Sequence, residues 1–328
     1  MKMRALTFNP ETNRWTVRAM PVPSLAESDV LVRVHACGLN PVDAKIAQWK
    51  SMAPQMDENW VAGLDVSGEA AAVGHSVTQW KVGDRVLTHG NMLRPHGGFA
   101  EYCVQDARAL IRHPATSAEL AAATPCAGWT AWRALHDKLR ITPQDTLLIA
   151  GGAGGVGGFA IQIAKLASLQ CIIATCSAQN AAYVKSLGAT HAIDYTNSDV
   201  TAKVREITNG VGVTRGLDCV GGANAKLVAE SLGYEGEMVE LVSTVEPKQY
   251  SNAFANGLSF HQLSLGSGHG NGDAGRAKLT ETGKVFSEKL ERGEIRVPQI
   301  RTITLEEAGP ELDGILQQRT VGKIVMCI

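Results

Sequence analysis

Membrane, secretory and nucleic-acid-binding signals are missing from this sequence. No apolar run approaches the ~18 residues of a membrane-spanning helix, and residues 1–15 lack the apolar stretch of a secretory signal. Lysine and arginine (31) balance aspartate and glutamate (32) to a net charge of -1, so no basic surface is expected to attract nucleic acid. We therefore expect a cytoplasmic protein that has neither a membrane nor a nucleic acid as a partner.

Closely spaced cysteines are missing as well. The seven cysteines are scattered, and no two of them stand at C-x-x-C spacing. An odd number at wide intervals argues against a disulfide framework and against a structural zinc cluster. We expect most of these thiols to be buried or idle.

Two different patterns of expected secondary structure follow one another along the chain, which indicates two domains. The length of 328 residues also indicates two domains, at ~150 residues per domain. Residues 1–120 contain short strand-like runs closed by glycine, typical of a partly closed antiparallel sheet. Residues 121–269 alternate strands with helices, which predicts a parallel, doubly wound sheet and an α/β fold class. Residues 270–328 end in an apolar strand that needs a sheet to join, so we expect them to complete the first domain.

A glycine-rich loop follows the first buried strand of the second domain. The stretch "LLIAGGAGGVG" has the order G-x-G-x-x-G and opens a helix, which is the context that gives this pattern meaning. A pyrophosphate must approach the backbone closely, and a helix N-terminus offers it unpaired N–H groups. The alternative is a tight turn that merely requires small residues. We predict a dinucleotide-binding loop formed by Gly152, Ala153, Gly154, Gly155 and Val156.

The acidic residue that usually binds the ribose of NAD is missing from the end of the next strand. That strand ends in "ATCSAQN", with Ser177 at its tip and Asn180 just behind it. Hydroxyl and amide donors bind a 2′-phosphate, whereas a carboxylate would repel it. The sequence therefore favours NADP(H), although the preference is expected to be modest because no arginine or lysine stands at the tip.

The motifs together resemble the zinc-independent quinone oxidoreductase and enone (alkenal) oxidoreductase branch of the medium-chain dehydrogenase/reductase superfamily. The resemblance rests on "GLNPVD", "GLDVSGE", "VGDRV", "GGFAEY", "AGWTAWRAL", "AGGAGGVGGFAIQIAK", "SLGATHAIDY" and "GKIVM". It implies a Rossmann domain beside a GroES-like, mostly antiparallel β domain. It also implies NADPH-dependent hydride transfer to quinones or to the C=C of α,β-unsaturated carbonyls. Members often form homodimers through the edge strand of the cofactor sheet, for which "FHQLSLG" is the candidate.

The metal ligands of zinc alcohol dehydrogenases are largely replaced. The resemblance places Asn40 where those enzymes have a cysteine, and Gly63, Leu64 and Asp65 where they have Gly-His-Glu. Cys126 coincides with the third ligand position. One thiolate does not hold a catalytic zinc ion, which takes three protein ligands. No metal is expected.

Lys45 in "NPVDAK" is the candidate catalytic residue. Hydride addition to a quinone or an enone builds negative charge on a carbonyl oxygen, which a positioned donor stabilises. The resemblance implies that Lys45 reaches the nicotinamide ribose and the substrate carbonyl; the alternative is a solvated surface lysine. Asn40 is expected to contact the nicotinamide region or the substrate, or else to be a turn residue before Pro41. Asp43 would orient the turn or pair with Lys45.

Further cofactor contacts follow from the resemblance. Thr130 is expected near the nicotinamide and Tyr195 on the adenosine side, against the alternatives of an interdomain helix residue and a core aromatic. Lys323 is expected near the pyrophosphate, or else as a solvated strand residue. The remaining contacts are expected at carboxyl ends of strands: Val220, Val242, Leu265 and Gly266. Three further residues are expected to line the substrate cleft: Trp49, Trp60 and Met92.

Two other classes of function remain open at this point. One is a zinc-type alcohol dehydrogenase, which the missing ligands disfavour. The other is a nucleotide-binding protein without turnover, which the presence of Lys45 beside a full glycine loop disfavours. The sequence names neither the quinone or enone nor the proton donor to the α carbon, for which water is the default.

Overall fold

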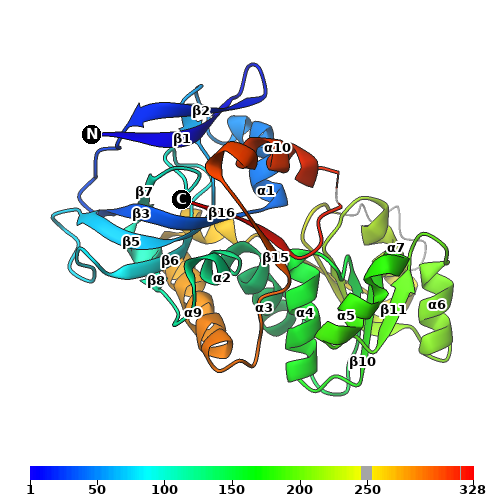
Figure 1. The fold of residues 1–328 in the computed structure, drawn as a ribbon. Coiled ribbons are helices and arrows are strands. Elements are labelled where there is room, and N and C mark those ends of the chain that lie inside the picture. Colours follow the sequence, from blue (N-terminus) through cyan, green and yellow to red (C-terminus); the bar gives the residue numbers. More distant parts are fainter. Residues whose placement is uncertain (245–252, 318) are drawn as a thin grey trace. The chain divides into compact units, whose positions relative to one another are not determined.

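The computed structural model describes residues 1–244, 253–317 and 319–328. The chain forms two compact units (Figure 1). Unit 1 comprises Met1–Trp129, Leu265–Gly293 and Gln299–Ile328, and unit 2 comprises Thr130–Ser264 and Glu294–Pro298. No helix in the described ranges combines the length and the apolar character that crossing a membrane requires.

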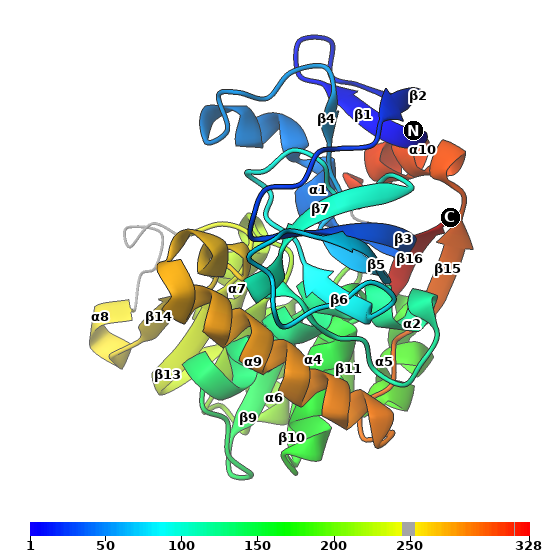
Figure 2. The same cartoon turned by 90° about the vertical axis from the view of Figure 1, so that its left-hand side faces the viewer.

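Unit 1 is built on a seven-stranded sheet in the order β15-β16-β3-β5-β6-β8, with β7 paired to β3. All its pairs are antiparallel except β15 with β16. The last strand pairs with β3, which confirms that the tail returns to the first domain, and Figure 2 shows β15, β16 and β3 side by side. The strands are β15 (Ile300–Ile303), β16 (Lys323–Cys327), β3 (Asp29–Leu39), β5 (Asp65–Val73), β6 (Arg85–His89), β8 (Ile111–Arg112) and β7 (Tyr102–Asp106).

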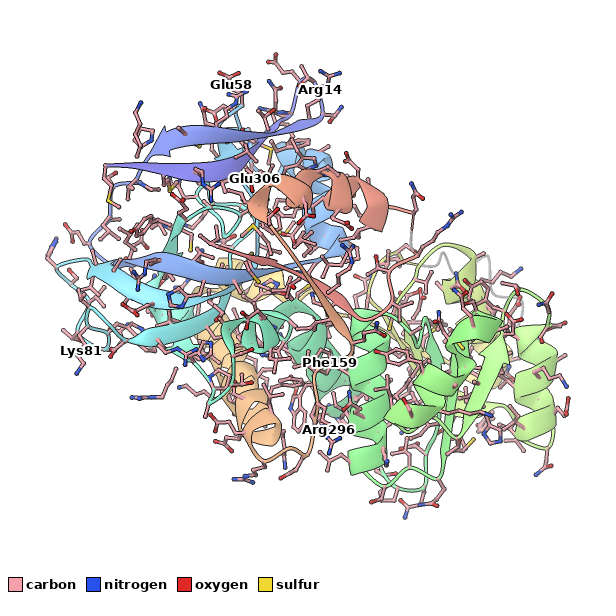
Figure 3. The ribbon with its side chains drawn as sticks, in the orientation of Figure 1. Arg14, Glu58, Lys81, Phe159, Arg296 and Glu306 are labelled. Carbon is pink, nitrogen blue, oxygen red and sulfur yellow. The ribbon has the colours of Figure 1, made fainter. Side chains whose placement is uncertain are left out.

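A smaller antiparallel sheet in unit 1 supports one helix. Its order is β2-β1-β4, with bounds Arg14–Pro21, Lys2–Asn9 and Trp60–Val61. Helix α10 (Leu305–Ile315) buries residues at helical spacing in the same core as β1. Its exposed face bears Glu306, which Arg4 contacts at 2.8 Å, and Figure 3 shows Glu306 beside this hairpin. The buried residues are Leu305, Ala308, Leu312 and Ile315.

The remaining helices of unit 1 are mostly short. The exception is α9 (Gly272–Glu291), which packs against the π-helical turn η3 (Pro125–Trp129): an added Cβ at Gly128 would meet the ring of Phe286 at 2.5 Å. The others are α1 (Pro41–Ala44), η1 (Ile46–Ser51), η2 (Ala107–Ala109), α2 (Ala118–Ala122) and η7 (Gly266–Gly270).

Unit 2 is a parallel sheet of six strands in the order β11-β10-β9-β12-β13-β14. Numbered within the unit, this order is 3-2-1-4-5-6, that of the doubly wound dinucleotide-binding fold. The prediction of a parallel, doubly wound sheet is confirmed. The strands are β9 (Thr146–Ala150), β10 (Cys171–Cys176), β11 (His191–Asp194), β12 (Val213–Asp218), β13 (Leu232–Glu240) and β14 (Ser259–Gln262).

The helices of unit 2 connect these strands. Helix α6 begins after Asp199, whose side chain caps it by accepting the N–H of Ala202. The helices are α3 (Thr130–Trp132), the π-helical η4 (Arg133–Lys138), α4 (Gly155–Leu166), η5 (Ala178–Asn180), α5 (Ala181–Leu187), α6 (Val200–Ile207), α7 (Ala223–Ser231) and α8 (Ala253–Asn256).

The boundaries between the units differ from the predicted ranges. The first falls after Trp129 rather than 120, because Trp129 lies against α9: a Cβ at Gly283 would meet its ring at 2.6 Å. The second falls at Leu265 rather than 269, because η7 is tied to β6 by His269, whose Nε2 lies 2.8 Å from the carbonyl oxygen of His89. Residues 294–298 return to unit 2, where the Gln162 side chain bonds the backbone of Arg296.

Candidate functional site

In the glycine loop of unit 2, two glycines are tightly packed and one borders open space. An added Cβ at Gly152 would come within 2.7 Å of Ala174 Cβ, and one at Gly157 within 2.3 Å of Gly151 O. A Cβ at Gly154 would meet only Gly151 O, at 3.5 Å, which is ordinary contact. Gly152 and Gly157 are therefore required by the fold, whereas Gly154 is not. The space that Gly154 leaves open is where a ligand would approach.

The same loop ends in a helix N-terminus that no side chain caps. Gly154 is the N-cap of α4, and the structure shows no side-chain hydrogen bond there. Gly155 and Val156 form the first turn, so their N–H groups and the helix dipole face the loop. Ala153, next to them, is 8% exposed. This arrangement suits a pyrophosphate.

The other predicted residues of unit 2 lie mostly at one edge of its sheet. Ser177, Tyr195, Val220 and Val242 follow β10, β11, β12 and β13, so all four share the carboxyl edge with the glycine loop. Tyr195 is 55% exposed, which rules out a core aromatic. Thr130 is buried at the start of α3.

The turn after β12 is shaped by a buried carboxylate that the sequence did not single out. Asp218 accepts the N–H groups of Val220 at 2.9 Å and of Gly221 at 3.0 Å. Burial raises the pKa of Asp218. Gly221 adopts a φ of 83°, which a side chain would strain. Asp218 thus positions the backbone of the "CVGG" turn.

A second carboxylate lies beside the tip of β10. Asn180 Nδ2 donates to Ser177 Oγ at 3.0 Å, so the two predicted donors contact one another. Asp194 ends the neighbouring strand, in register with Cys176. Its carboxylate accepts hydrogen bonds from Thr196 and Asn197, which lower the pKa of Asp194. Asp194 is not part of the motif at the end of β10, because it belongs to the strand that pairs with β10.

Unit 1 contains a buried polar cluster, which we define as Asn40, Asp43, Asp65, Cys126 and Lys323. Four of these side chains come from the ends of β3, β5 and β16 and from the start of α1, and they are at most 4% exposed. The fifth, Cys126, comes from η3, and its backbone N–H donates to Asp65 Oδ1 at 2.8 Å. The cluster therefore joins segments that are far apart in the sequence.

Asn40 lies at the centre of the cluster. Its Nδ2 donates to Asp65 Oδ2 at 2.9 Å and to Asp43 Oδ2 at 3.2 Å, and its backbone N–H donates to the same Asp43 oxygen at 3.0 Å. Its Oδ1 accepts from Lys323 Nζ. Both halves of the amide are thus taken up inside the protein, as a cap of α1. These contacts agree with the alternative of a turn residue, while the expected contact of Asn40 with the nicotinamide region or the substrate stays a prediction.

Lys323 is almost fully buried, so it is not a solvated strand residue, and its expected place near the pyrophosphate stays a prediction. Its Nζ also donates to Leu39 O at 3.1 Å and lies 3.4 Å from Asp65 Oδ2. Leu265 and Gly266 belong to unit 1, and their expected contact with the cofactor stays a prediction. A Cβ on Gly266 would lie 3.6 Å from the ring of His89.

Burial governs the charge of the cluster. Burial, with repulsion from Asp65, raises the pKa of Asp43 to about 7, and Asp43 Oδ1 has no partner among the described residues. Burial also raises the pKa of Asp65, which Lys323 and Asn40 oppose. The Cys126 thiol has its pKa raised well above the usual range by burial and by Asp65. Cys126 is therefore a neutral thiol in this arrangement.

Lys45 stands at the end of the turn that the cluster fixes. It is the C-cap of α1, with its backbone N–H bonded to Pro41 O at 3.1 Å. The side chain is half-buried, and within the described ranges no hydrogen-bond or ion-pair partner contacts its Nζ. The alternative pairing with Asp43 is not formed in this structure; Asp43 instead orients the turn, because its Oδ2 accepts hydrogen bonds from Asn40.

A small cleft, with a volume of about 40 Å³, opens in unit 1. Two of the residues expected to line the substrate cleft, Trp49 and Trp60, are in its wall, and Met92 is not. Trp60 Nε1 is buried without a hydrogen-bond partner among the described residues. Polar groups also reach the wall from Asn91 and Arg94.

Known proteins match this chain along most of its length. Residues 26–115 match the alcohol dehydrogenase GroES-like domain, and residues 155–277 match the zinc-binding dehydrogenase family. A chloroplast envelope quinone oxidoreductase homolog of Arabidopsis thaliana is 32% identical over 68% of this chain and 68% of its own. The chain belongs to the medium-chain dehydrogenase/reductase family.

Further relatives agree with this membership. A trans-enoyl reductase of Pyrenochaetopsis sp is 35% identical over 67% of this chain, and the match spans 63% of that relative. The crystal structure of a quinone oxidoreductase from Pseudomonas syringae pv. Tomato DC3000 superimposes with a TM-score of 0.85, at 27% identity, over 99% of this chain and 100% of the other. The GroES-like and Rossmann parts are thereby confirmed. Membership in this dehydrogenase family implies a pyridine-nucleotide cofactor, which the glycine loop fits.

The zinc implied by one family description does not fit the buried polar cluster as it stands. Asp65, His89 and Cys126 place possible ligand atoms within 4.8 Å of one another. Both oxygens of Asp65 already accept hydrogen bonds, and the Lys323 ammonium lies beside one of them. Zinc requires a thiolate where Cys126 is a thiol, and a second cation would face the ammonium.

Proposed function

We propose that this protein is an NADPH-dependent, zinc-independent reductase that transfers hydride to quinones or to the C=C of α,β-unsaturated carbonyls. The observation that carries the proposal is the Lys45 ammonium, which has no partner among the described residues and follows a turn that Asn40 and Asp43 cap. Relatives named quinone oxidoreductase and trans-enoyl reductase support the same class of substrate. The proposed activity rests on the Lys45 ammonium and on the named relatives taken together.

The chemistry needs a donor at the substrate oxygen. NADPH, when bound, supplies the hydride. As the acceptor gains it, negative charge develops on the carbonyl oxygen, and the Lys45 ammonium donates a hydrogen bond to that oxygen. Loss of one such donor typically lowers kcat by ~100–1000-fold. Water delivers the proton to the α carbon of an enone.

The preference for NADPH is supported by the groups at the tip of β10. Ser177 Oγ and the Asn180 amide offer neutral donors for a 2′-phosphate. The negative charge of Asp194 would disfavour a 2′-phosphate, but its carboxylate already accepts hydrogen bonds from Thr196 and Asn197. We therefore propose a modest preference for NADPH over NADH.

We also propose a homodimer that pairs through β14. This strand ends the described sheet of unit 2, and Ser259, Phe260 and Gln262 on it are exposed. Light scattering of the purified protein at micromolar concentration checks the molar mass. A monomer under those conditions would remove the dimer from the proposal.

A substrate panel tests the reaction. Purified protein is mixed with NADPH and, in turn, a quinone, a short alkenal and a cyclic enone, with and without a chelator. We expect NADPH consumption with at least one acceptor and no effect of the chelator. Consumption that the chelator abolishes would favour a zinc-type alcohol dehydrogenase, for which the donors near Asp65 are the favouring observation. No consumption at all would favour a nucleotide-binding protein without turnover.

A further inference from the structure

Unit 2 contains a pocket away from its glycine loop. The pocket has a volume of about 410 Å³, which lies within the ~300–1,000 Å³ of small-molecule sites. Its wall includes Arg215, near the start of β12, and Ser259, the first residue of β14, whereas the glycine loop follows the carboxyl end of β9. We call it the basic pocket, and its charged and polar lining residues are Lys138, Arg140, Arg215, Glu237, Ser259 and His261.

Arg215 is held in the wall of the basic pocket by its own contacts. Its Nε donates to Leu139 O at 3.1 Å, and its Nη1 donates to Thr214 O at 3.1 Å. Asp145 Oδ1 lies 3.4 Å from Nε, and Glu237 Oε1 lies 3.8 Å from Nη1, so carboxylates balance its charge. No hydrogen bond or ion pair involves its Nη2 within the part of the chain that the structure describes. One side of an oriented guanidinium therefore remains available to an acceptor.

Lys138 and Arg140 provide positive charge that the wall does not balance. Lys138 is half-buried and Arg140 is exposed, and neither side chain forms an ion pair or a hydrogen bond in the described ranges. The carboxylate of the wall, on Glu237, lies instead 3.1 Å from His261 Nε2 and 3.8 Å from Arg215 Nη1. Two unpaired cations at one pocket attract a ligand that carries about two negative charges.

We propose that the basic pocket binds a small organic phosphate, whose phosphate group is held by Lys138, Arg140 and the Nη2 of Arg215. Lysine and arginine form short, charge-assisted hydrogen bonds to phosphate oxygens. A phosphate monoester carries ~1.5–2 negative charges at pH 7, which matches the two unpaired cations. A phosphate group alone fills only part of about 410 Å³, so the rest of the pocket accommodates the organic part of the ligand.

Calorimetric titrations of the purified full chain test the site and separate two sources of the same phosphate chemistry. The probes are inorganic phosphate, ribose 5-phosphate and ribose, each added at low ionic strength in the presence of NADP⁺, which occupies the predicted cofactor site. We expect one equivalent of ribose 5-phosphate to bind at least threefold more tightly than inorganic phosphate, because the pocket also holds the sugar. Ribose without a phosphate group is expected not to bind.

A charge-matched pair of variants assigns the binding to this pocket. Lys138→Gln/Arg140→Gln removes both unpaired cations and is expected to weaken the binding of ribose 5-phosphate at least tenfold, since each lost charged donor typically costs ~1.5–3 kcal/mol. Lys185→Gln/Lys203→Gln removes the same charge from α5 and α6 of the same unit, outside the pocket. This control is expected to keep the wild-type affinity.

Glu237→Gln provides a change in the opposite direction. It removes the negative charge from the wall and keeps an oxygen that accepts from His261. We expect Glu237→Gln to bind ribose 5-phosphate at least threefold more tightly than the wild type, because repulsion between the carboxylate and the phosphate is lost. A gain in affinity does not arise from loss of structure, so this variant decides the question if the double variant does not fold.

Four results would overturn the proposal. They are a wild-type protein that does not bind ribose 5-phosphate up to millimolar concentration, equal affinities for ribose 5-phosphate and inorganic phosphate, an equal loss of affinity in the two double variants, and a Glu237→Gln protein with unchanged or weaker binding. The proposal does not rest on reductase activity, because the titrations measure binding of ligands that are neither hydride donors nor acceptors.

Discussion

Lys323 Nζ lies 3.4 Å from Asp65 Oδ2, and both side chains are almost fully buried in unit 1. A buried ion pair is stable only when further hydrogen bonds satisfy both partners. Here Asn40 bridges the pair, since its amide donates to Asp65 and accepts from Lys323. Asn40 also caps α1, so the charge arrangement and the turn that carries Lys45 are fixed by the same side chain.

This bridge bears on the proposed zinc independence. Asp65 would be the anchor of a metal in this unit, and its two oxygens are bonded instead to Asn40 and to the backbone of Cys126. The positive charge next to it is fixed by the fold. Lys45 lies outside the bridge, and its Nζ has no hydrogen-bond or ion-pair partner among the described residues.

Gly154 and Gly157 offer a matched pair of substitutions in the cofactor loop. A Cβ at Gly154 has only ordinary contacts and its φ is -78°, so Gly154→Ala is expected to change the free energy of unfolding by less than ~1 kcal/mol. It is nevertheless expected to weaken NADPH binding at least tenfold, because the Cβ occupies the open space at the loop. Gly157→Ala places its Cβ 2.3 Å from Gly151 O and is expected to cost ~1–3 kcal/mol of stability.

Urea unfolding and fluorescence titration with NADPH separate the two effects. A Gly154→Ala protein with wild-type NADPH affinity would contradict the assignment of the loop to the pyrophosphate. A Gly157→Ala protein of unchanged stability would contradict the packing argument instead.

The fold could be predicted from the sequence where the signals are local. The alternation of buried strands and helices in residues 130–244 determines a parallel sheet, and the glycine loop marks its first strand. The return of β16 to unit 1 was also predictable, since an apolar strand needs a partner. The boundary at Trp129 was not, because it depends on the packing of that ring against α9, more than a hundred residues further along the chain.

The sequence indicates several residues of the candidate site, but it does not show what most of them contact. Asn40, Lys45 and Lys323 stand out by resemblance, but no local pattern states that Lys323 is buried against Asp65, 258 residues away. The sequence likewise does not show that Asp194 lies beside the tip of β10, because that depends on which strand pairs with β10. Long-range pairing, and not local propensity, decides these contacts.

The cofactor preference is expected to respond to charge at the tip of β10. Ser177→Asp places a carboxylate where a 2′-phosphate would bind and is expected to lower kcat/KM for NADPH at least tenfold, with a smaller effect on NADH. Asp194→Asn removes the neighbouring carboxylate and is expected to raise kcat/KM for NADPH. Initial rates with both cofactors check these changes. Equal use of NADPH and NADH by the wild-type protein would contradict the proposed preference.

The stability of the protein is expected to fall as the pH rises through the raised pKa of Asp43. The pKa of Asp43 is raised to about 7 in the folded state, against ~3.9 in an unfolded chain. The folded state therefore holds the proton more tightly, and its advantage is complete below pH ~4 and lost as the pH rises through about 7. The free energy of unfolding is expected to decrease by ~2–3 kcal/mol between pH 5 and pH 8 from this group.

Asp43→Asn checks the source of that pH dependence. Its amide oxygen still accepts from Asn40, so the cap of α1 is kept while the titration is removed. Urea unfolding at several pH values should show a flatter profile for Asp43→Asn than for the wild type. Asp84→Asn, in the surface turn where Asp84 accepts the N–H of Lys81, is the control and should keep the wild-type profile. Parallel profiles for wild type and Asp43→Asn would mean that Asp43 does not titrate in this range.

Lys45→Ala addresses the proposed chemistry directly. We expect kcat for a conjugated ketone to fall at least tenfold, because the negative charge on the carbonyl oxygen loses its donor. The affinity for NADPH should change less, since the glycine loop and the tip of β10 lie in unit 2. Lys81→Ala removes a lysine from the exposed turn labelled in Figure 3 and should leave kcat unchanged. Single-turnover rates with a quinone, an enone and each variant measure the step itself, and a Lys45→Ala protein with wild-type turnover would remove Lys45 from the mechanism.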